Sequence, residues 1–132
     1  MVCVTRQKTC ARLIELGALL AKNRDAGLIV VHALRKNDSV LGDRNEAEAL
    51  EWLFSAATDN GGELMVVRSD DVAGALATTA QKYGASVVVM GTTPITEPVS
   101  FSARIKSMLP DREIICVDGE NSAGELRITM NC

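Results

Sequence analysis

A short loop that follows an apolar run carries the residue types best suited to chemistry. Gly91, Thr92 and Thr93 come directly after the run that ends at Met90, and Pro94 follows them. A glycine leaves backbone N–H groups accessible and two hydroxyls add donors, so the group suits an anion near the start of the next helix. The same residues also fit a simple turn that leads the chain out of a sheet. Spacing alone leaves both interpretations open.

Two further features could support catalysis or metal binding, and each also has a structural interpretation. His32, the only histidine, has no aspartate or serine partner within reach in the sequence, so we expect a packed or hydrogen-bonding histidine rather than a base. Asp70 and Asp71 precede a helix-period segment, where carboxylates cap the helix and interact favourably with its dipole. We therefore predict no catalytic residue and no metal site.

The spacing of the cysteines also predicts no metal site. The four cysteines are scattered, without a CxxC pair or the spacing of a zinc site: Cys3, Cys10, Cys116 and Cys132. In a core-rich chain without secretory features, we expect reduced, structural thiols.

A repeated pattern organises the chain: a helix-period segment, a glycine and a short apolar run. The apolar runs lie at residues 28–31, 64–67 and 87–90. Glycine just past a helix supplies the left-handed C-cap conformation, and uninterrupted apolar runs are typical of strands buried on both faces. Successive helix–strand units with right-handed crossovers predict a parallel, doubly wound α/β sheet.

Periodicity and chain breakers set the expected boundaries. We expect strands over residues 2–5, 28–33, 63–68, 86–90 and 112–117, and helices over 7–23, 45–59, 71–83 and 100–109. The inward-facing residues should be Leu13, Leu16, Gly17 and Leu20, then Leu50, Leu53, Phe54 and Ala57, then Val72, Leu76, Ala80 and Tyr83. Residues 1–118 form the domain, and the tail at 119–132 includes an alternating segment expected to pair with a sheet edge or with another chain.

Composition limits the classes of function. The chain has 132 residues, enough for one domain, and its 47% hydrophobic but only 3% aromatic content predicts an aliphatic core. A net charge of -3 argues against nucleic acid as a partner. No apolar run reaches the roughly 18 residues that a membrane span needs. Residues 1–4 resemble a strand rather than a signal peptide, so we expect a cytoplasmic protein.

The stretch from Asp70 to Gly91 and the run at 28–33 resemble the universal stress protein family. The first stretch combines an Asp-Asp-Val-Ala opening, an alanine-rich helix and the string Gly-Ala-Ser-Val-Val-Val-Met-Gly. It is also similar to a domain of osmosensitive potassium-channel sensor kinases. The resemblance extends to Asp118 and implies an adenine nucleotide alpha hydrolase-like fold. This fold has five parallel strands in the order 3-2-1-4-5 and a homodimer along the last strand.

Many members of this family bind ATP, and the resemblance implies cofactor-binding positions here. Val4 and Thr5 occupy the segment after the first strand, where Arg6 replaces an acidic residue of the family pattern. His32 and Ala33 resemble the pair whose backbone holds adenine.

The phosphate-binding pattern is altered. The family pattern is Gly-x-x-Gly, nine residues, then Gly-Ser or Gly-Thr, whereas this chain keeps Gly91 but has Pro94 at the second glycine. Only seven residues separate Pro94 from Ser102, and no glycine adjoins that serine. Proline has no N–H and a fixed φ, so it cannot replace a glycine that lets backbone approach a phosphate. The full candidate set is Val4, Thr5, His32, Ala33, Met90, Gly91, Thr92, Thr93 and Ser102.

Three hypotheses follow. The first is a non-catalytic, dimeric stress-response or regulatory module without tight ATP binding, for which no cofactor is expected. The second is a sensor of ATP, AMP or another adenylate, in which four hydroxyls replace glycine amides, those of Thr92, Thr93, Ser100 and Ser102. The third is a weak ATP hydrolase, for which the sequence offers no nucleophile–base pair.

Overall fold

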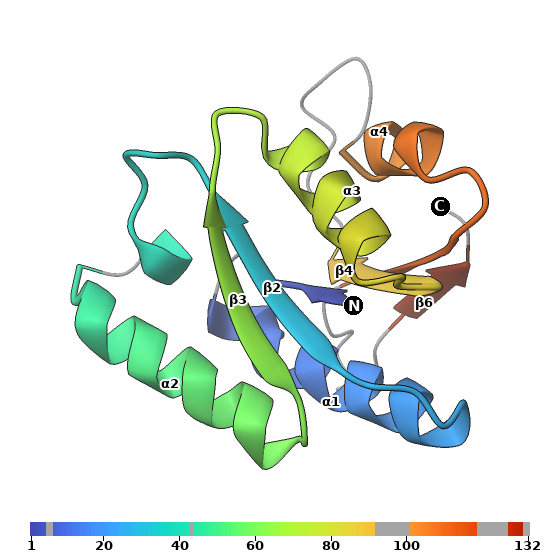
Figure 1. Ribbon diagram of the computed structural model, residues 1–132. Coiled ribbons are helices and arrows are strands. Elements are labelled where there is room, and N and C mark those ends of the chain that lie inside the picture. The colour runs from blue at the N-terminus through green and yellow to red at the C-terminus, as the bar shows by residue number, and fades with distance from the viewer. Residues whose placement is uncertain (5–6, 43, 92–100, 119–126, 131–132) are drawn as a thin grey trace.

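The computed structural model describes residues 1–4, 7–42, 44–91, 101–118 and 127–130. Helices and strands alternate along the chain, as the sequence pattern predicts (Figure 1). The strands are β1 (Val2–Cys3), β2 (Ile29–Leu34), β3 (Glu63–Arg68), β4 (Val87–Gly91), β5 (Glu113–Asp118) and β6 (Arg127–Met130). The helices are α1 (Gln7–Asn23), the 3-10 helix η1 (Val40–Gly42), α2 (Glu46–Asp59), α3 (Val72–Lys82) and α4 (Phe101–Met108).

The strands form one sheet in the order β3-β2-β1-β4-β5-β6. The first five are parallel, which confirms the expected order 3-2-1-4-5. Helices α1 and α2 cover one face, and α3 and α4 cover the other (Figure 1). The sheet is therefore doubly wound, and β1 lies at its centre.

An aliphatic core fills both layers between sheet and helices. The α1/α2 side buries Val2, Ile14, Val30, Leu53 and Val89. The α3/α4 side buries Val31, Leu76, Ile105, Ile114 and Cys116. Because parallel strands are buried on both faces, alternate residues of one strand enter different layers.

Two of the predicted inward faces are partly wrong, those of α2 and α3. In α2, Leu53 and Ala57 are buried as expected, but Leu50 is 40% and Phe54 is 56% exposed. Ala49 occupies the core instead, because residues 49, 53 and 57 form a stripe with a spacing of four residues. The larger side chains beside this stripe point toward solvent, so side-chain size misled the prediction.

The helix ends follow the glycine pattern in two of three cases. Gly61 and Gly84 have φ of +78° and +63°, the left-handed conformation expected after α2 and α3. After α1 this conformation belongs to Asp25 (φ 52°) rather than to Gly27. Aspartate tolerates it better than most residues. Tyr83 was expected to face inward, but it is the C-cap of α3 and is 41% exposed.

The C-terminal tail contributes a strand to the same sheet. β6 pairs antiparallel with β5, with Cys116 opposite Thr129 and Val117 opposite Ile128. The expected extra strand is therefore present and lies at the sheet edge. It covers the edge of β5 at which the family resemblance places a dimer contact.

Two buried cysteines differ in state. Cys3 is a free thiol whose pKa burial raises to about 12. Cys116 is disulfide-bonded, so the expectation of reduced thiols is wrong at this position. Disulfide pairing depends on topology, which cysteine spacing does not reveal. Within the described residues, none of the helices has the length and apolar character needed to cross a bilayer.

Candidate functional site

The carboxyl ends of the central strands bring three predicted site residues to one level of the sheet. Cys3 pairs with Val31 of β2 and with Met90 of β4, so the residues that follow, Val4, His32 and Gly91, lie side by side at this edge. The backbone N–H of Val4 donates to the carbonyl oxygen of Val31 at 3.0 Å. Ligands of open α/β sheets bind at such an edge, where strand order reverses. Here the reversal lies between β1 and β4.

The other predicted residues contribute less, or lie outside the described part. Ala33 and Met90 are buried in the α3/α4 layer, so only their backbone can face a ligand. Ser102 is half-buried in α4 and engaged in an interaction. Thr5, Thr92 and Thr93 lie outside the described residues.

His32 uses both ring nitrogens in hydrogen bonds. The ring is 2% exposed. Nδ1 lies 2.8 Å from the carbonyl oxygen of Val4, and Nε2 accepts the backbone N–H of Leu41 at 2.9 Å. Burial is the main reason why the pKa of His32 is lowered. This side chain joins β1, β2 and η1, as expected for a hydrogen-bonding histidine rather than a general base.

Arg68, at the end of β3, holds the segment between β2 and α2 from another side. Its Nη1 donates to the carbonyl oxygens of Lys36 at 3.2 Å and Asp38 at 2.7 Å. Its Nη2 pairs with the carboxylate of Glu46. Glu46 Oε1 also accepts the N–H of Val40 at 3.3 Å. The charge of Arg68 thus interacts with oxygens of the protein itself, and no pattern in the sequence indicated this contact.

Gly91 is not required by the fold. A Cβ on this residue would lie 3.7 Å from Leu13 Cδ1 and 3.9 Å from the Val117 carbonyl oxygen, both ordinary contact distances. Alanine at this position should therefore fold, so Gly91→Ala is a control for a larger substitution that tests ligand binding.

The paired aspartates have structural roles. Asp71 caps α3 by accepting the N–H of Gly74 at 3.0 Å, and it also lies 3.8 Å from Arg104. Asp70 lies 3.6 Å from Lys36. Among the described residues, no group of histidines, cysteines and carboxylates could hold a metal ion.

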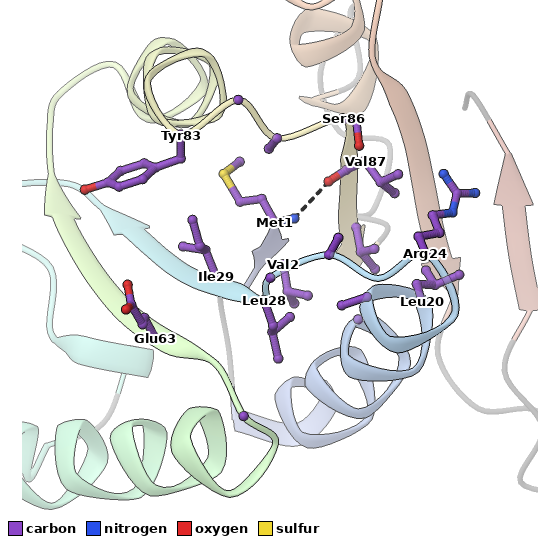
Figure 2. Close-up of a pocket in the computed structure, with 18 residues that line it drawn as sticks. Met1, Val2, Leu20, Arg24, Leu28, Ile29, Glu63, Tyr83, Ser86 and Val87 are labelled. Atoms are coloured by element: carbon purple, nitrogen blue, oxygen red, sulfur yellow. Dashed lines mark hydrogen bonds between the residues drawn. The ribbon is translucent and has the colours of Figure 1, made fainter.

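A hollow lies at the opposite, amino edge of the sheet (Figure 2). Its volume is about 430 Å³, and polar and apolar groups share its walls, the apolar side chains being those of Val2, Leu20, Leu28, Ile29, Tyr83 and Val87. Arg24, at one rim, is paired with Glu113 at 2.8 Å, while Glu63 lies at the other rim. These charges do not favour a polyphosphate. No motif in the sequence indicated this hollow.

Comparisons with known proteins agree with the fold. A sequence model described as the Universal stress protein family matches residues 1–99. The sequence matches none of the curated proteins with which it was compared. A universal stress protein from Archaeoglobus fulgidus has a similar structure, with 21% identity, a TM-score of 0.64 and coverage of 87% of this chain and 89% of its own.

Two other solved structures are similar to the same extent. One is the Archaeoglobus fulgidus protein in complex with dAMP, with 20% identity, a TM-score of 0.60 and coverage of 87% of this chain and 93% of its own. The other is a family protein from Burkholderia pseudomallei, with 22% identity, a TM-score of 0.61 and the same two coverages, 87% and 93%. At these identities the likeness establishes the fold.

Proposed function

Because this chain belongs to the universal stress protein family, we propose that it is a non-catalytic stress-response or regulatory module, dimeric and without tight ATP binding. The observation that carries this proposal is Pro94, which stands where the family pattern has the second phosphate-binding glycine. A proline offers no N–H to a phosphate oxygen and restricts the approach of the backbone. The proposal places the protein in the cytoplasm.

The environment of His32 supports a role without catalysis. A general base must keep a nitrogen available for the proton that it removes. Both nitrogens of His32 are engaged, with Val4 and Leu41, and the ring is buried. The side chain best suited to proton transfer at neutral pH therefore serves the fold.

A dimer along the last strand would use β6 in this chain. The edge of β5 is already paired with β6, so a second copy would meet the free edge of β6. Size-exclusion chromatography with light scattering tests this assembly. A dimer that Thr129→Pro converts to a monomer supports it, because proline removes a strand N–H donor. A monomeric wild type would contradict it.

Binding of a small adenylate is the second candidate function. A structural relative from Archaeoglobus fulgidus was solved in complex with dAMP. In this chain Val4, His32 and Gly91 lie together at the carboxyl edge of the sheet, where ligands of open α/β sheets bind. AMP has one phosphate, whereas ATP has three, so AMP needs fewer contacts with the phosphate loop. Loss of a glycine amide should therefore weaken the binding of AMP less than that of ATP.

Thermal unfolding with ligands separates the two candidates. A ligand that binds only the folded state raises Tm according to its concentration relative to Kd. We expect no rise with millimolar Mg-ATP, and Pro94→Gly should introduce one, whereas the matched control Pro110→Gly should not. A rise of several degrees in the wild type with Mg-ATP would contradict the leading proposal. A rise with AMP alone that Gly91→Ala leaves intact but Gly91→Val abolishes would favour the adenylate sensor.

A further inference from the structure

The two hydrogen bonds of His32 require opposite roles from its two nitrogens. A carbonyl oxygen, that of Val4, faces Nδ1, and a backbone N–H, that of Leu41, faces Nε2. Only the neutral ring with its proton on Nδ1 satisfies both partners. A proton added to Nε2 would face the Leu41 N–H, and two donors cannot share a hydrogen bond.

We propose that His32 is a proton-operated latch that holds η1 against the carboxyl edge of the sheet and releases it when Nε2 is protonated. The proton comes from solvent, and no covalent bond other than N–H forms. The inference rests on the proposed regulatory function and names its signal, a change in proton concentration. Adenylate binding is not needed for the latch to operate.

The segment that the latch holds has an unfavourable backbone conformation. Leu41 is 5% exposed and has φ 55° and ψ 16°, a left-handed conformation that L side chains rarely adopt. The adjacent Val40 is also buried, and both pack in the α1/α2 layer. The hydrogen bond from Leu41 to His32 therefore helps to hold a conformation that the backbone does not favour by itself. Its loss removes a hydrogen bond between this turn and β2.

Burial of His32, together with the charge of Arg68, keeps the latch closed at neutral pH. Arg68 approaches from β3, and Glu46, at the start of α2, is paired with it. Arg6, which follows β1, lies outside the described residues. Burial first, and then the charge of Arg68, lower the pKa of His32, while the hydrogen bond to Val4 raises it. The latch should therefore open below the ordinary histidine range of about pH 6.5.

The released segment lies beside the candidate ligand edge. The carbonyl oxygen of Val4 accepts the other His32 hydrogen bond. Val4 follows β1 and lies beside Gly91 of β4, at the point where the strand order reverses. Protonation leaves the Nδ1–H bond to Val4 intact, so the ring keeps its place while η1 departs. The expected response is a local rearrangement of residues 40–42 with the sheet unchanged.

Nuclear magnetic resonance of protein labelled with ¹⁵N-histidine tests the latch directly, because His32 is the only histidine. At about pH 7.5 we expect the neutral Nδ1–H tautomer, and one titration below about pH 6.5. The hydrogen-exchange protection of the Leu41 amide should fall roughly tenfold along the same titration. The Ala85 amide, bonded to Ala80 at the amino edge, is the control and should keep its protection.

Substitution of His32 distinguishes the effect of its protonation from the effect of the side chain as a hydrogen-bond acceptor. His32→Gln offers an uncharged oxygen near the Nε2 position, so Leu41 protection should persist and become independent of pH. An Nε2–H tautomer at neutral pH, or unchanged Leu41 protection after His32 is protonated, would overturn the latch. A pH-dependent loss of Leu41 amide protection in a folded H32Q protein would overturn the latch as well. These readouts are independent of the Mg-ATP experiment, so failure of the latch and failure of the proposed function are distinguishable.

Discussion

The two edges of the same sheet differ in how their space is used. At the carboxyl edge, His32 and Arg68 form hydrogen bonds to the segment between β2 and α2 and hold it in place. At the amino edge, apolar side chains surround a hollow of about 430 Å³, and the charge of Arg24 is balanced by Glu113 (Figure 2). Position in a fold therefore indicates where a site should lie, whereas the local side chains decide what the edge can bind.

Removal of the carboxyl-edge hydrogen bonds should have the largest effect on stability. His32→Leu leaves the Leu41 N–H and the Val4 carbonyl buried without their partner. Each unsatisfied group costs about 1–3 kcal/mol, so we expect the free energy of unfolding to fall by about 3 kcal/mol. Urea denaturation measures it, with Leu50→Ala on the half-exposed face of α2 as a control. A loss no larger than the control's would show that this edge is not held by His32.

The amino edge should be sensitive to added volume rather than to lost hydrogen bonds. A Cβ on Gly17 would lie 2.1 Å from Val2 Cγ2, a fully buried atom of the central strand. Gly17→Ala should therefore lower the free energy of unfolding by about 2 kcal/mol despite the better helix propensity of alanine. Gly27→Ala is the matched control, because nothing lies within 4 Å of its Cβ. Equal stability of the two variants would refute the tight contact between α1 and β1.

Acidification should lower the free energy of unfolding less than His32→Leu or Gly17→Ala does. We expect this effect to arise from protonation of His32 at the carboxyl edge. The pKa of His32 is lower in the folded protein than in the unfolded chain, so the unfolded state binds more protons between these two pKa values. Stability is then complete above about pH 6.5 and falls as pH decreases toward the folded pKa of His32. Urea midpoints across this range measure the slope, which should be absent in H32Q. A rise in stability on acidification would reverse the sign and contradict the buried neutral ring.

A helix cap near the carboxyl edge should contribute a smaller amount. Asp71→Ala removes the acceptor for the Gly74 N–H and should lower the free energy of unfolding by about 1 kcal/mol. Asp70→Ala removes only an exposed contact to Lys36 and should have almost no effect. If Asp70 proved the more costly of the two, the assignment of the cap would be wrong.

The smallest effect is expected at the rim of the amino-edge hollow. Glu113→Gln removes the ion pair with Arg24, whose side chain is 45% exposed. Many exposed ion pairs contribute nothing measurable, so Tm should stay within error. A clear decrease in Tm would mean that this pair closes the hollow and belongs to the structure of the edge.

Part of the site could be predicted because strand ends are local features of the sequence. The end of the apolar run at Met90 and the His32-Ala33 pair identified the carboxyl edge, and the register places Gly91 and Val4 together there. The hydrogen bonds of His32 could not be predicted, because Leu41 becomes its partner only after the segment following β2 folds back. The same reason applies to Arg68, which contacts Lys36 and Asp38 some thirty residues earlier.

Local patterns in the sequence specify the class of the fold, because apolar runs and helix periods are short-range features of each element. Residues such as Pro94 likewise reveal the family and the altered phosphate loop. Tertiary packing is what buries Ala49 rather than Phe54, gives the left-handed turn to Asp25 rather than Gly27, and covers the edge of β5 with β6. Those outcomes depend on which segments meet in space, and contacts across the sheet are a property of the whole chain rather than of any local pattern.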